Sequence, residues 1–338
     1  MNERAIIERA QKAVDERVFP GCVVGAVFAD GKRMIVPIGS LAYESGAHEV
    51  RAATVYDLAS VPKSIPVASL ALAFAAEGKF ALADPVARFL PELKNDYGAT
   101  IEDLLRYRVH GVQLSNLRHM TSDAIRNYVF EHGFDGPPGE SNYTNFPAFL
   151  LGMIIERVGG KSLESLGRSY FFDRLDMPAT TFFPSAADCA PTEIDGFDEL
   201  TAGDRGEVCG LPHDESAYQF AIAGECAGHA GLFSTAPDLL NFLEGLLRPN
   251  VRFTKSNIDI DGASKGLGWQ IEGDFLGHYA STGSFGKTGF TGTSVCVDPS
   301  KGVAFVILSN RTYPKRPTDD SAINAFRADI ADIILGSI

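Results

Sequence analysis

Ser60 and Lys63 have the spacing that lets a lysine activate a serine. They stand three residues apart at the predicted start of an apolar helix that runs to about Gly78. Residues at this spacing share a helix face, with Cβ atoms about 5–6 Å apart, so the amine can reach the hydroxyl. A serine becomes a nucleophile when a base takes its proton, and a desolvated lysine can be that base. The N–H groups at a helix start can also stabilise an oxyanion.

Ser-x-x-Lys is a weak motif when it stands alone. Ser284 and Lys287 have the same spacing in this chain. Ser60 could equally be a serine that caps a helix. The residues further along the chain separate the two interpretations.

Tyr143 and Asn145 form a second group, after a loop rich in proline and glycine at residues 135–142. Such a loop can present both side chains to a cleft. Nearby lysines can lower the pKa of a tyrosine enough for it to act as a general base. Asn145 could hold Lys63 or donate to a substrate carbonyl. Considered alone, Tyr143 could be an ordinary half-buried tyrosine.

Lys287, Thr288 and Gly289 form the third group, in a stretch rich in glycine and threonine. A strand of this composition lets a ligand lie close against its backbone. The charge of Lys287 favours a carboxylate and would help to lower the pKa of Tyr143. Considered alone, this stretch could be an ordinary strand with an exposed lysine.

The three groups follow one another in the chain, and Tyr-x-Asn and Lys-Thr-Gly occur once each. With them the sequence resembles the serine β-lactamase and penicillin-binding-protein superfamily, on the side of class C β-lactamases and related esterases. The resemblance implies a β-lactamase/transpeptidase-like fold of the mixed α/β class, an antiparallel sheet flanked by helices plus an inserted, mostly helical domain. It covers roughly residues 15 to 335, including the stretches 228–239, 266–269, 288–292 and 308–311.

The resemblance assigns catalytic roles to Ser60, Lys63, Tyr143 and Lys287. It implies acyl transfer by double displacement, in which Ser60 attacks a carbonyl while Lys63 and Tyr143 remove its proton. Tyr143 then protonates the leaving group, and water cleaves the acyl-enzyme. We expect no cofactor and no catalytic metal, because the seven histidines show no zinc-binding pairing.

The resemblance also implies an oxyanion hole and a substrate-binding edge. The backbone N–H groups of Ser60 and Phe290 would form the oxyanion hole, where the loss of one donor typically costs about 3–4 kcal/mol. Asn145, Thr288 and Gly289 would bind the substrate, which we expect to be a small acyl compound.

Two departures from the family pattern bear on the substrate. Residues 106–111 replace the His-Thr-Ser-Gly-Leu of many relatives, so we expect a reshaped cleft rim. Phe290 is bulky where β-lactamases usually carry a small residue, and we expect it to crowd an acylamino group. The main expectation is therefore a carboxylesterase-type hydrolase. The alternatives are a β-lactamase or D-alanyl-D-alanine carboxypeptidase, or a binding or sensor protein that is acylated but scarcely turns over.

Strands at both ends of the chain, with helices between them, must position these groups. Asp30 and Gly31 predict a hairpin between two strands, and one sheet built from both ends of the chain would follow. The domains would be an α/β domain of residues 1–83 and 251–338 and an inserted mainly helical domain of residues 84–250, with the active-site cleft between them. Strands are predicted at residues 22–28, 33–37, 267–271, 286–290, 294–297 and 303–308, and a final helix at 321–335.

The composition restricts partners and location. A net charge of −13 argues against binding to nucleic acid or to anionic membranes. The five scattered cysteines have no metal-binding or redox spacing, which indicates reduced thiols in an intracellular protein. Residues 1–10 are predicted to form an amphipathic helix and not a signal peptide, so the expected location is the cytoplasm, unless a leader has been removed from an exported protein. The sequence leaves the oligomeric state open.

Two further motifs lack the context that they need. Residues 262–266 match the Gly-x-Ser-x-Gly elbow of α/β-hydrolases, but without a strand before and a helix after them they are predicted to be a loop. Gly160, Lys161 and Ser162 look like half a P-loop, but Ile155 stands where the first glycine is needed. We predict a turn at the end of a helix there.

Overall fold

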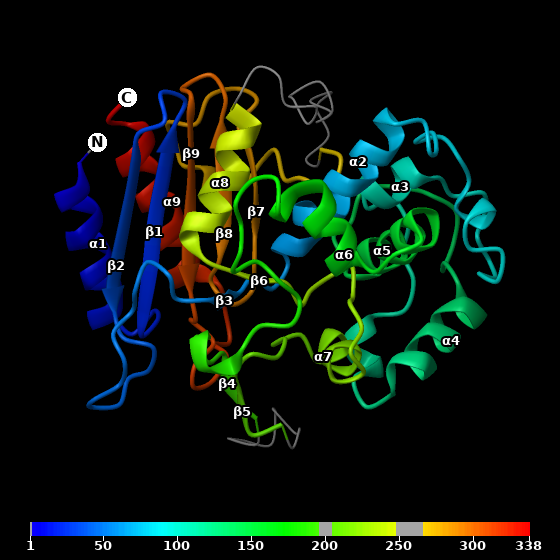
Figure 1. The fold of residues 1–338 in the computed structure, drawn as a ribbon, viewed down its shortest axis with the longest axis horizontal. Helices are drawn as coiled ribbons and strands as arrows, with labels where there is room; N and C mark the ends of the chain where they lie inside the picture. Colours follow the sequence, from blue (N-terminus) through cyan, green and yellow to red (C-terminus); the bar gives the residue numbers. More distant parts are fainter. Residues whose placement is uncertain (1, 196–204, 248–265) are drawn as a thin grey trace.

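The computed structural model describes residues 2–195, 205–247 and 266–338. A five-stranded sheet in the order β2-β1-β9-β8-β7 forms one side of the molecule, and every neighbouring pair of strands is antiparallel (Figure 1). This confirms that one sheet draws on both ends of the chain. The strands are β1 (Gly21–Phe28), β2 (Arg33–Gly39), β7 (Phe285–Thr288), β8 (Ser294–Asp298) and β9 (Val303–Ser309).

Helices cover both faces of this sheet. Successive side chains of a strand point to opposite faces, and in the central strands the side chains on both faces are apolar, so both faces must be buried. Val24 of β1 belongs to the apolar cluster formed with α1 (Glu3–Asp15) and α9 (Ser321–Leu335). Its neighbour Val23 belongs to the cluster that includes α8 (Ala236–Leu247). Both ends of the chain lie together beside α1 and α9 (Figure 1).

The remaining helices gather beyond the β7 edge of the sheet (Figure 1). Two short antiparallel pairs accompany these regions: β3 with β6 lies between them, and β4 with β5 lies at the lower edge of the view in Figure 1. The elements are α2 (Ser69–Ala76), α3 (Ile101–Leu105), α4 (Ser122–His132), α5 (Phe146–Gly159), α6 (Leu163–Gly167), α7 (Glu215–Ile222), β3 (Tyr56–Asp57), β4 (Glu193–Ile194), β5 (Glu207–Val208) and β6 (Phe233–Ser234).

The division into two domains stays a prediction, but α8 bears on its boundary. This helix lies within the predicted insertion of residues 84–250, yet it packs against β1 and β9 of the sheet. Leu240 of α8, for example, lies so close to Gly25 of β1 that a Cβ atom there would be 3.0 Å from its Cδ1. The helix therefore belongs to the layers that surround the sheet.

The expected continuous helix from Ser60 to Gly78 is wrong. A single 3₁₀ turn, Val61–Lys63, follows Ser60, and α2 begins only at Ser69. Between them Ile65 has the extended conformation (φ −122°, ψ 101°). Pro66 gives the physical reason, because the residue before a proline is disfavoured in the helical region. The Ser-x-x-Lys spacing is thus presented by one tight turn.

The strand expected at residues 267–271 is also wrong. Only Gln270 makes a strand-like bridge, to Gly286 of β7. Gly268 has φ +78°, which favours glycine, and its N–H donates to the carbonyl of Leu105 at 2.9 Å. The segment therefore turns across the start of the helical region and does not extend the sheet.

The other local predictions had mixed outcomes. Gly160 is left-handed and ends α5, which confirms the predicted turn at a helix end. Residues 262–265 of the Gly-x-Ser-x-Gly match lie outside the described residues. All five cysteines lie within the described residues, and none forms a disulfide bond. Within the described ranges, no helix has the length and apolar character needed to cross a membrane.

Candidate active site

A strained turn places Ser60 after β3. Ala59 has φ +50°, a conformation that L-residues other than glycine rarely adopt. The side chain of Asp57 holds this turn, because it accepts from the N–H of Ala59 at 2.8 Å and from the N–H of His213 at 2.6 Å. Strain of this kind persists only where the surrounding structure fixes it, and it occurs frequently at functional sites.

Lys63 is the immediate partner of Ser60. Its Nζ lies 2.8 Å from Ser60 Oγ and donates to the carbonyl of His229 at 2.7 Å. The side chain is buried, and burial lowers the pKa of Lys63 to about 7, with the charge of Asp214 opposing the shift. A large fraction of Lys63 is therefore neutral at neutral pH, and the neutral amine can accept the proton of Ser60.

Tyr143 joins this pair from the loop before α5. Its hydroxyl hydrogen-bonds with Ser60, and its ring lies 4.0 Å from Lys287 Nζ and 5.4 Å from Lys63 Nζ. The residue is 37% exposed, so a substrate can reach it. The structure thus brings together Ser60, Lys63, Tyr143 and Lys287, whose catalytic roles stay a prediction.

The expected lowering of the Tyr143 pKa is wrong in direction. Although 37% of the residue is exposed, burial around its hydroxyl raises the pKa of Tyr143; the hydrogen bond with Ser60 opposes this in part, and the charge of Asp214 adds to it. Its phenol is therefore protonated at neutral pH. In this state Tyr143 can donate a proton to a leaving group, whereas Lys63 is the group that can act as a base.

Lys287 lies between two aromatic rings. It is 1% exposed, and its Nζ lies 4.0 Å from the Tyr143 ring centre and 5.5 Å from that of Tyr107. The two rings are themselves 5.2 Å apart. Such contacts stabilise a desolvated ammonium by about 2 kcal/mol. Tyr107 belongs to the segment 106–111 that departs from the family pattern, but no motif pointed to it as a neighbour of the site.

The turn after β7 is joined to the backbone that precedes Ser60. Thr291 Oγ1 donates to the carbonyl of Asp57 at 2.8 Å, and Thr293 Oγ1 donates to that of Leu58 at 3.0 Å. Gly289 is needed at this junction, because a Cβ atom there would lie 2.5 Å from the oxygen of Leu58. Glycine therefore allows the two segments to touch.

This junction carries both proposed oxyanion-hole donors. Among the described residues, no protein group accepts from the N–H of Ser60 or from that of Phe290. Both donors are thus available to an oxyanion. Phe290 is 41% exposed, and its ring lies 5.6 Å from that of His213.

Asn145 and Thr288 have protein partners that the sequence did not indicate. Asn145 Nδ2 donates to Asp214 at 3.0 Å, while Lys63 is held by the carbonyl of His229. The N–H and Oγ1 of Thr288 both lie within hydrogen-bond distance of Gln270 Oε1, at 3.0 and 3.2 Å. Their substrate-binding roles stay a prediction.

Asp214 is a charged group of the site that no sequence motif indicated. It caps α7, with Oδ1 accepting from Ser216 Oγ at 2.6 Å and from the N–H of Ala217 at 2.9 Å, and it pairs with His229 Nε2 at 3.1 Å. Burial would raise the pKa of Asp214, but the charge of His229 and these hydrogen bonds outweigh burial and hold it below its usual range. Asp214 is therefore ionised beside Lys63.

Replacing Asp214 with asparagine should shift the pH profile of acylation. The carboxylate raises the pKa of Lys63, so its loss lowers that pKa and leaves more of the neutral base at any given pH. We expect the rising limb of kcat/KM to move to lower pH by more than about 0.5 unit, measured with an activated ester. Asparagine also caps helices well, so α7 should persist.

Glu215→Gln is the matched control for this prediction. It removes a neighbouring charge from the first turn of α7, but Glu215 pairs with Arg316 at 2.8 Å and contributes nothing to the pKa of Lys63. Its pH profile should match that of the wild type. If the rise of kcat/KM in Asp214→Asn occurred at the same pH as in the wild type, the carboxylate of Asp214 would not raise the pKa of Lys63.

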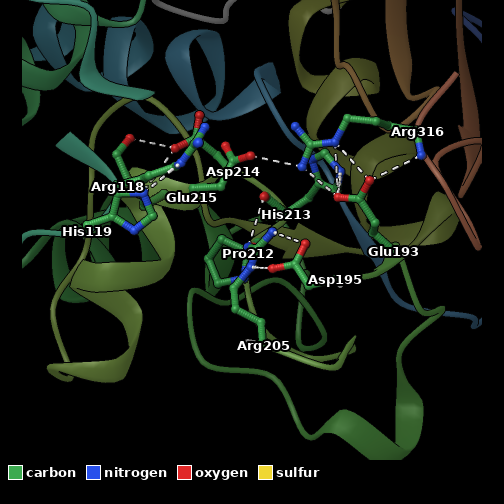
Figure 2. A network of polar contacts seen from close by, with 12 residues as sticks. Arg118, His119, Glu193, Asp195, Arg205, Pro212, His213, Asp214, Glu215 and Arg316 are labelled. Atoms are coloured by element: carbon green, nitrogen blue, oxygen red, sulfur yellow. Dashed lines mark hydrogen bonds and ion pairs between the residues drawn. The ribbon is translucent and has the colours of Figure 1, made fainter. Parts of the chain in front are cut away.

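An ion-pair network surrounds His213 (Figure 2), whose ring contacts that of Phe290. Glu193 is fully buried, accepts from Arg316 Nη2 at 2.5 Å and lies 3.0 Å from His213 Nε2. Burial would raise the pKa of Glu193, but Arg316 and His213 hold it well below its usual range. Because His213 contacts both the Phe290 ring and Asp57, this network links the proposed oxyanion hole to the turn before Ser60.

The chemistry of this arrangement defines a class of protein. A serine paired with a buried, partly neutral lysine, a protonated tyrosine and two unengaged N–H donors is suited to acyl transfer through a serine ester. Within the described part of the chain, no group of three or more His, Cys, Asp or Glu side chains could hold a metal ion. The fold and the site are thus those of a serine hydrolase.

Comparison with known families agrees with this class. The family model described as Beta-lactamase matches residues 6–329, so the chain belongs to the beta-lactamase family. A protein of Salmonella paratyphi A, provisionally named a D-alanyl-D-alanine carboxypeptidase, is 28% identical over 331 residues, which cover 82% of this chain and 74% of the relative. The chain is accordingly a β-lactamase-family serine hydrolase.

Solved structures show the same fold. EstCE1, described as a hydrolase with promiscuous acyltransferase activity, has a TM-score of 0.78 and 19% identity, with 99% of this chain and 98% of that one covered. The D-alanine carboxypeptidase AmpC of Burkholderia cenocepacia has a TM-score of 0.71 and 20% identity, with 99% of both chains covered. These likenesses confirm the predicted β-lactamase/transpeptidase-like fold.

Proposed function

We propose that this chain is a carboxylesterase-type hydrolase that acylates Ser60 with a small ester or amide. The contact of 2.8 Å between Ser60 Oγ and the buried Nζ of Lys63 carries the proposal, because it joins a nucleophile to a base whose pKa is about 7. Neutral Lys63 takes the proton of Ser60 as Oγ bonds to the substrate carbonyl. The N–H groups of Ser60 and Phe290 stabilise the resulting oxyanion.

The second half of the reaction uses Tyr143. As the tetrahedral intermediate collapses, the bond to the leaving group breaks, and the phenol of Tyr143 donates its proton to the departing alcohol or amine. Tyr143 then receives the proton that Lys63 took from Ser60, which returns Lys63 to its neutral form. Water then attacks the acyl-enzyme, the acid leaves, and Ser60 Oγ regains a proton. Lys287 stabilises the site through its position against the Tyr143 ring.

The groups that could bind a substrate carboxylate favour an ester over a D-alanyl peptide. The hydroxyl of Thr288 donates to Gln270 Oε1, and Lys287 is buried against two tyrosine rings. A carboxylate would have to displace these contacts, whereas an uncharged ester would not. The exposed ring of Phe290 beside the oxyanion donors also favours a substrate without an acylamino group.

A D-alanyl-D-alanine carboxypeptidase is the second candidate. The provisional name of the relative that is 28% identical over most of the chain favours it. In that case Lys287 and Thr288 would exchange their present partners for the terminal carboxylate of the peptide.

One comparison of three substrates separates these functions. The protein is incubated with p-nitrophenyl butyrate, with a peptide that ends in D-Ala-D-Ala, and with benzylpenicillin, and turnover and intact mass are followed. Fast ester turnover with slow peptide release supports the esterase. Preferred release of D-alanine supports the carboxypeptidase. A lasting penicilloyl adduct without turnover of either substrate indicates an acylated binding or sensor protein.

A further inference from the structure

Arg327 of α9 is a buried cation with an unusual set of partners. It is 4% exposed, and among the described residues no carboxylate lies within ion-pair distance of its guanidinium. Burial and the charge of Arg311 lower the pKa of Arg327 to about 10, so it remains charged at neutral pH. Burying a charge without an opposite charge is costly, which calls for an account of what the guanidinium does.

The guanidinium donates to two backbone carbonyls of the turn after β7. Arg327 Nη2 lies 2.7 Å from the oxygen of Gly289 and 2.8 Å from that of Thr293. Its Nη1 donates to Asn324 Oδ1 at 2.9 Å, which fixes the guanidinium on the surface of α9. The buried charge is therefore directed at the segment that carries Phe290.

One of these carbonyls belongs to the peptide group that ends in the Phe290 N–H. The bond between Gly289 and Phe290 is trans, so its C=O and N–H point in opposite directions. A donor bound to the oxygen therefore fixes the direction of the N–H. Because this donor is charged, it also polarises the peptide group and strengthens the N–H as a hydrogen-bond donor.

Arg311 holds the next peptide group in the same way. Its Nε donates to the oxygen of Phe290 at 2.7 Å, and its guanidinium carbon lies 4.9 Å from the Phe290 ring. Arg311 in turn pairs with Asp320. Both peptide groups that flank the α-carbon of Phe290 are thus held by arginines, and of the two arginines Arg327 contacts the group with the proposed oxyanion donor. The oxygen of that group also accepts from the N–H of Gly292 at 3.1 Å.

We propose that Arg327 is a positioning residue for the oxyanion hole, which aims and polarises the Phe290 N–H through the carbonyl of Gly289. The inference rests on the proposed function, since that function makes the Phe290 N–H a donor to the oxyanion. If Arg327 had a purely structural role, it would hold the turn but would not stabilise the transition state more than the bound substrate. The two roles differ in what they do to kcat and to the binding of a tetrahedral adduct.

The experiment compares ester turnover with the affinity for phenylboronic acid, which forms an anionic tetrahedral adduct with a nucleophilic serine. In Arg327→Met, kcat for p-nitrophenyl butyrate should fall roughly 10- to 100-fold, somewhat less than for complete loss of one oxyanion donor. KM should change less than about threefold, and Kd for phenylboronic acid should rise in parallel with the fall in kcat. Arg327→Lys, which retains a charge without the planar fork, should give an intermediate loss.

Two further variants test the inference in a fold that is little disturbed. Asn324→Ala removes the acceptor that fixes the guanidinium, and it should weaken kcat and boronic acid binding together by a few-fold. Asp329 lies on the same helix as Arg327, and Asp329→Ala removes only an ion pair with Arg9 of α1, so it should change neither quantity. If Arg327→Met does not fold, Arg327→Lys and Asn324→Ala decide the outcome.

The outcomes separate this inference from the proposed function. With an active wild type, unchanged kcat and boronic acid affinity in the folded Arg327 and Asn324 variants would overturn the role of Arg327. A rise in KM alone would overturn it as well, since that result indicates a structural turn. A wild type that neither hydrolyses esters nor binds phenylboronic acid would instead contradict the proposed function itself.

Discussion

Ser60→Ala should abolish the turnover of p-nitrophenyl butyrate, with kcat falling on the order of 10⁶-fold, as for other serine hydrolases that lose their nucleophile. The change removes only the atom that would form the acyl bond. Ser60 makes no side-chain capping bond, and Lys63 keeps its hydrogen bond to the carbonyl of His229. The variant should therefore fold, which thermal unfolding measures, and intact mass should show no acyl adduct. Undiminished hydrolysis by the purified variant would end the proposal.

Ser284→Ala is the matched control, because Ser284 and Lys287 form the other Ser-x-x-Lys of the chain. Ser284 immediately precedes β7, and residues three apart along a strand point to opposite faces of the sheet. Its buried Oγ has no hydrogen-bond partner among the residues that the structure describes. Turnover by this variant should match that of the wild type. A loss as large as that in Ser60→Ala would mean that the assignment of the nucleophile is wrong.

Lys63→Met should lower kcat/KM by about 10²- to 10⁴-fold and remove its dependence on pH near neutrality. The ammonium of Lys63 must lose its proton before the amine can accept the proton of Ser60. Because the pKa of Lys63 is about 7, wild-type kcat/KM should rise as the pH passes through about 7 and then level off. Methionine keeps the length and the apolar stem but cannot titrate. Rate profiles between about pH 5 and pH 9 measure both effects.

Tyr143→Phe tests whether Lys63 or Tyr143 causes the rise of kcat/KM near pH 7. The phenol of Tyr143 is protonated throughout this range, because burial raises its pKa. The variant should acylate more slowly by orders of magnitude yet keep a limb near pH 7. If the limb persisted in Lys63→Met, another group would be the base. A wild-type rate in Tyr143→Phe would leave Lys63 as the sole residue that transfers protons.

The sheet was predictable from local patterns. The apolar runs of β1 and β9 and the Asp30-Gly31 turn follow rules that act over a few residues. The interruption of the expected helix at Ile65 was not predicted, because the apolar residues around it fit a helix. Pro66 was the residue that indicated it. A strand was also expected at residues 267–271, but the segment turns where Gly268 binds the carbonyl of Leu105, a contact between residues far apart in the sequence.

The site was predictable only where its residues are close in the sequence. Ser60 and Lys63 meet because one turn brings them together. Asp214 influences Lys63 from more than a hundred residues further along the chain, and Arg327 contacts backbone atoms, so no spacing rule identifies them. The direction of the Tyr143 pKa shift depends on burial, which is a property of the folded chain.

The pairing of β1 with β9 has a consequence for biosynthesis. Cys22 lies opposite Ser309, so β1 cannot complete its pairing until residues 303–309 have left the ribosome. Until then its hydrogen-bonding edge is open, a state in which nascent chains aggregate or recruit chaperones. Phe290 is synthesised in the same late portion as β9. A shortened product that ends before this portion would therefore lack half of the proposed oxyanion hole and the central pairing of the sheet.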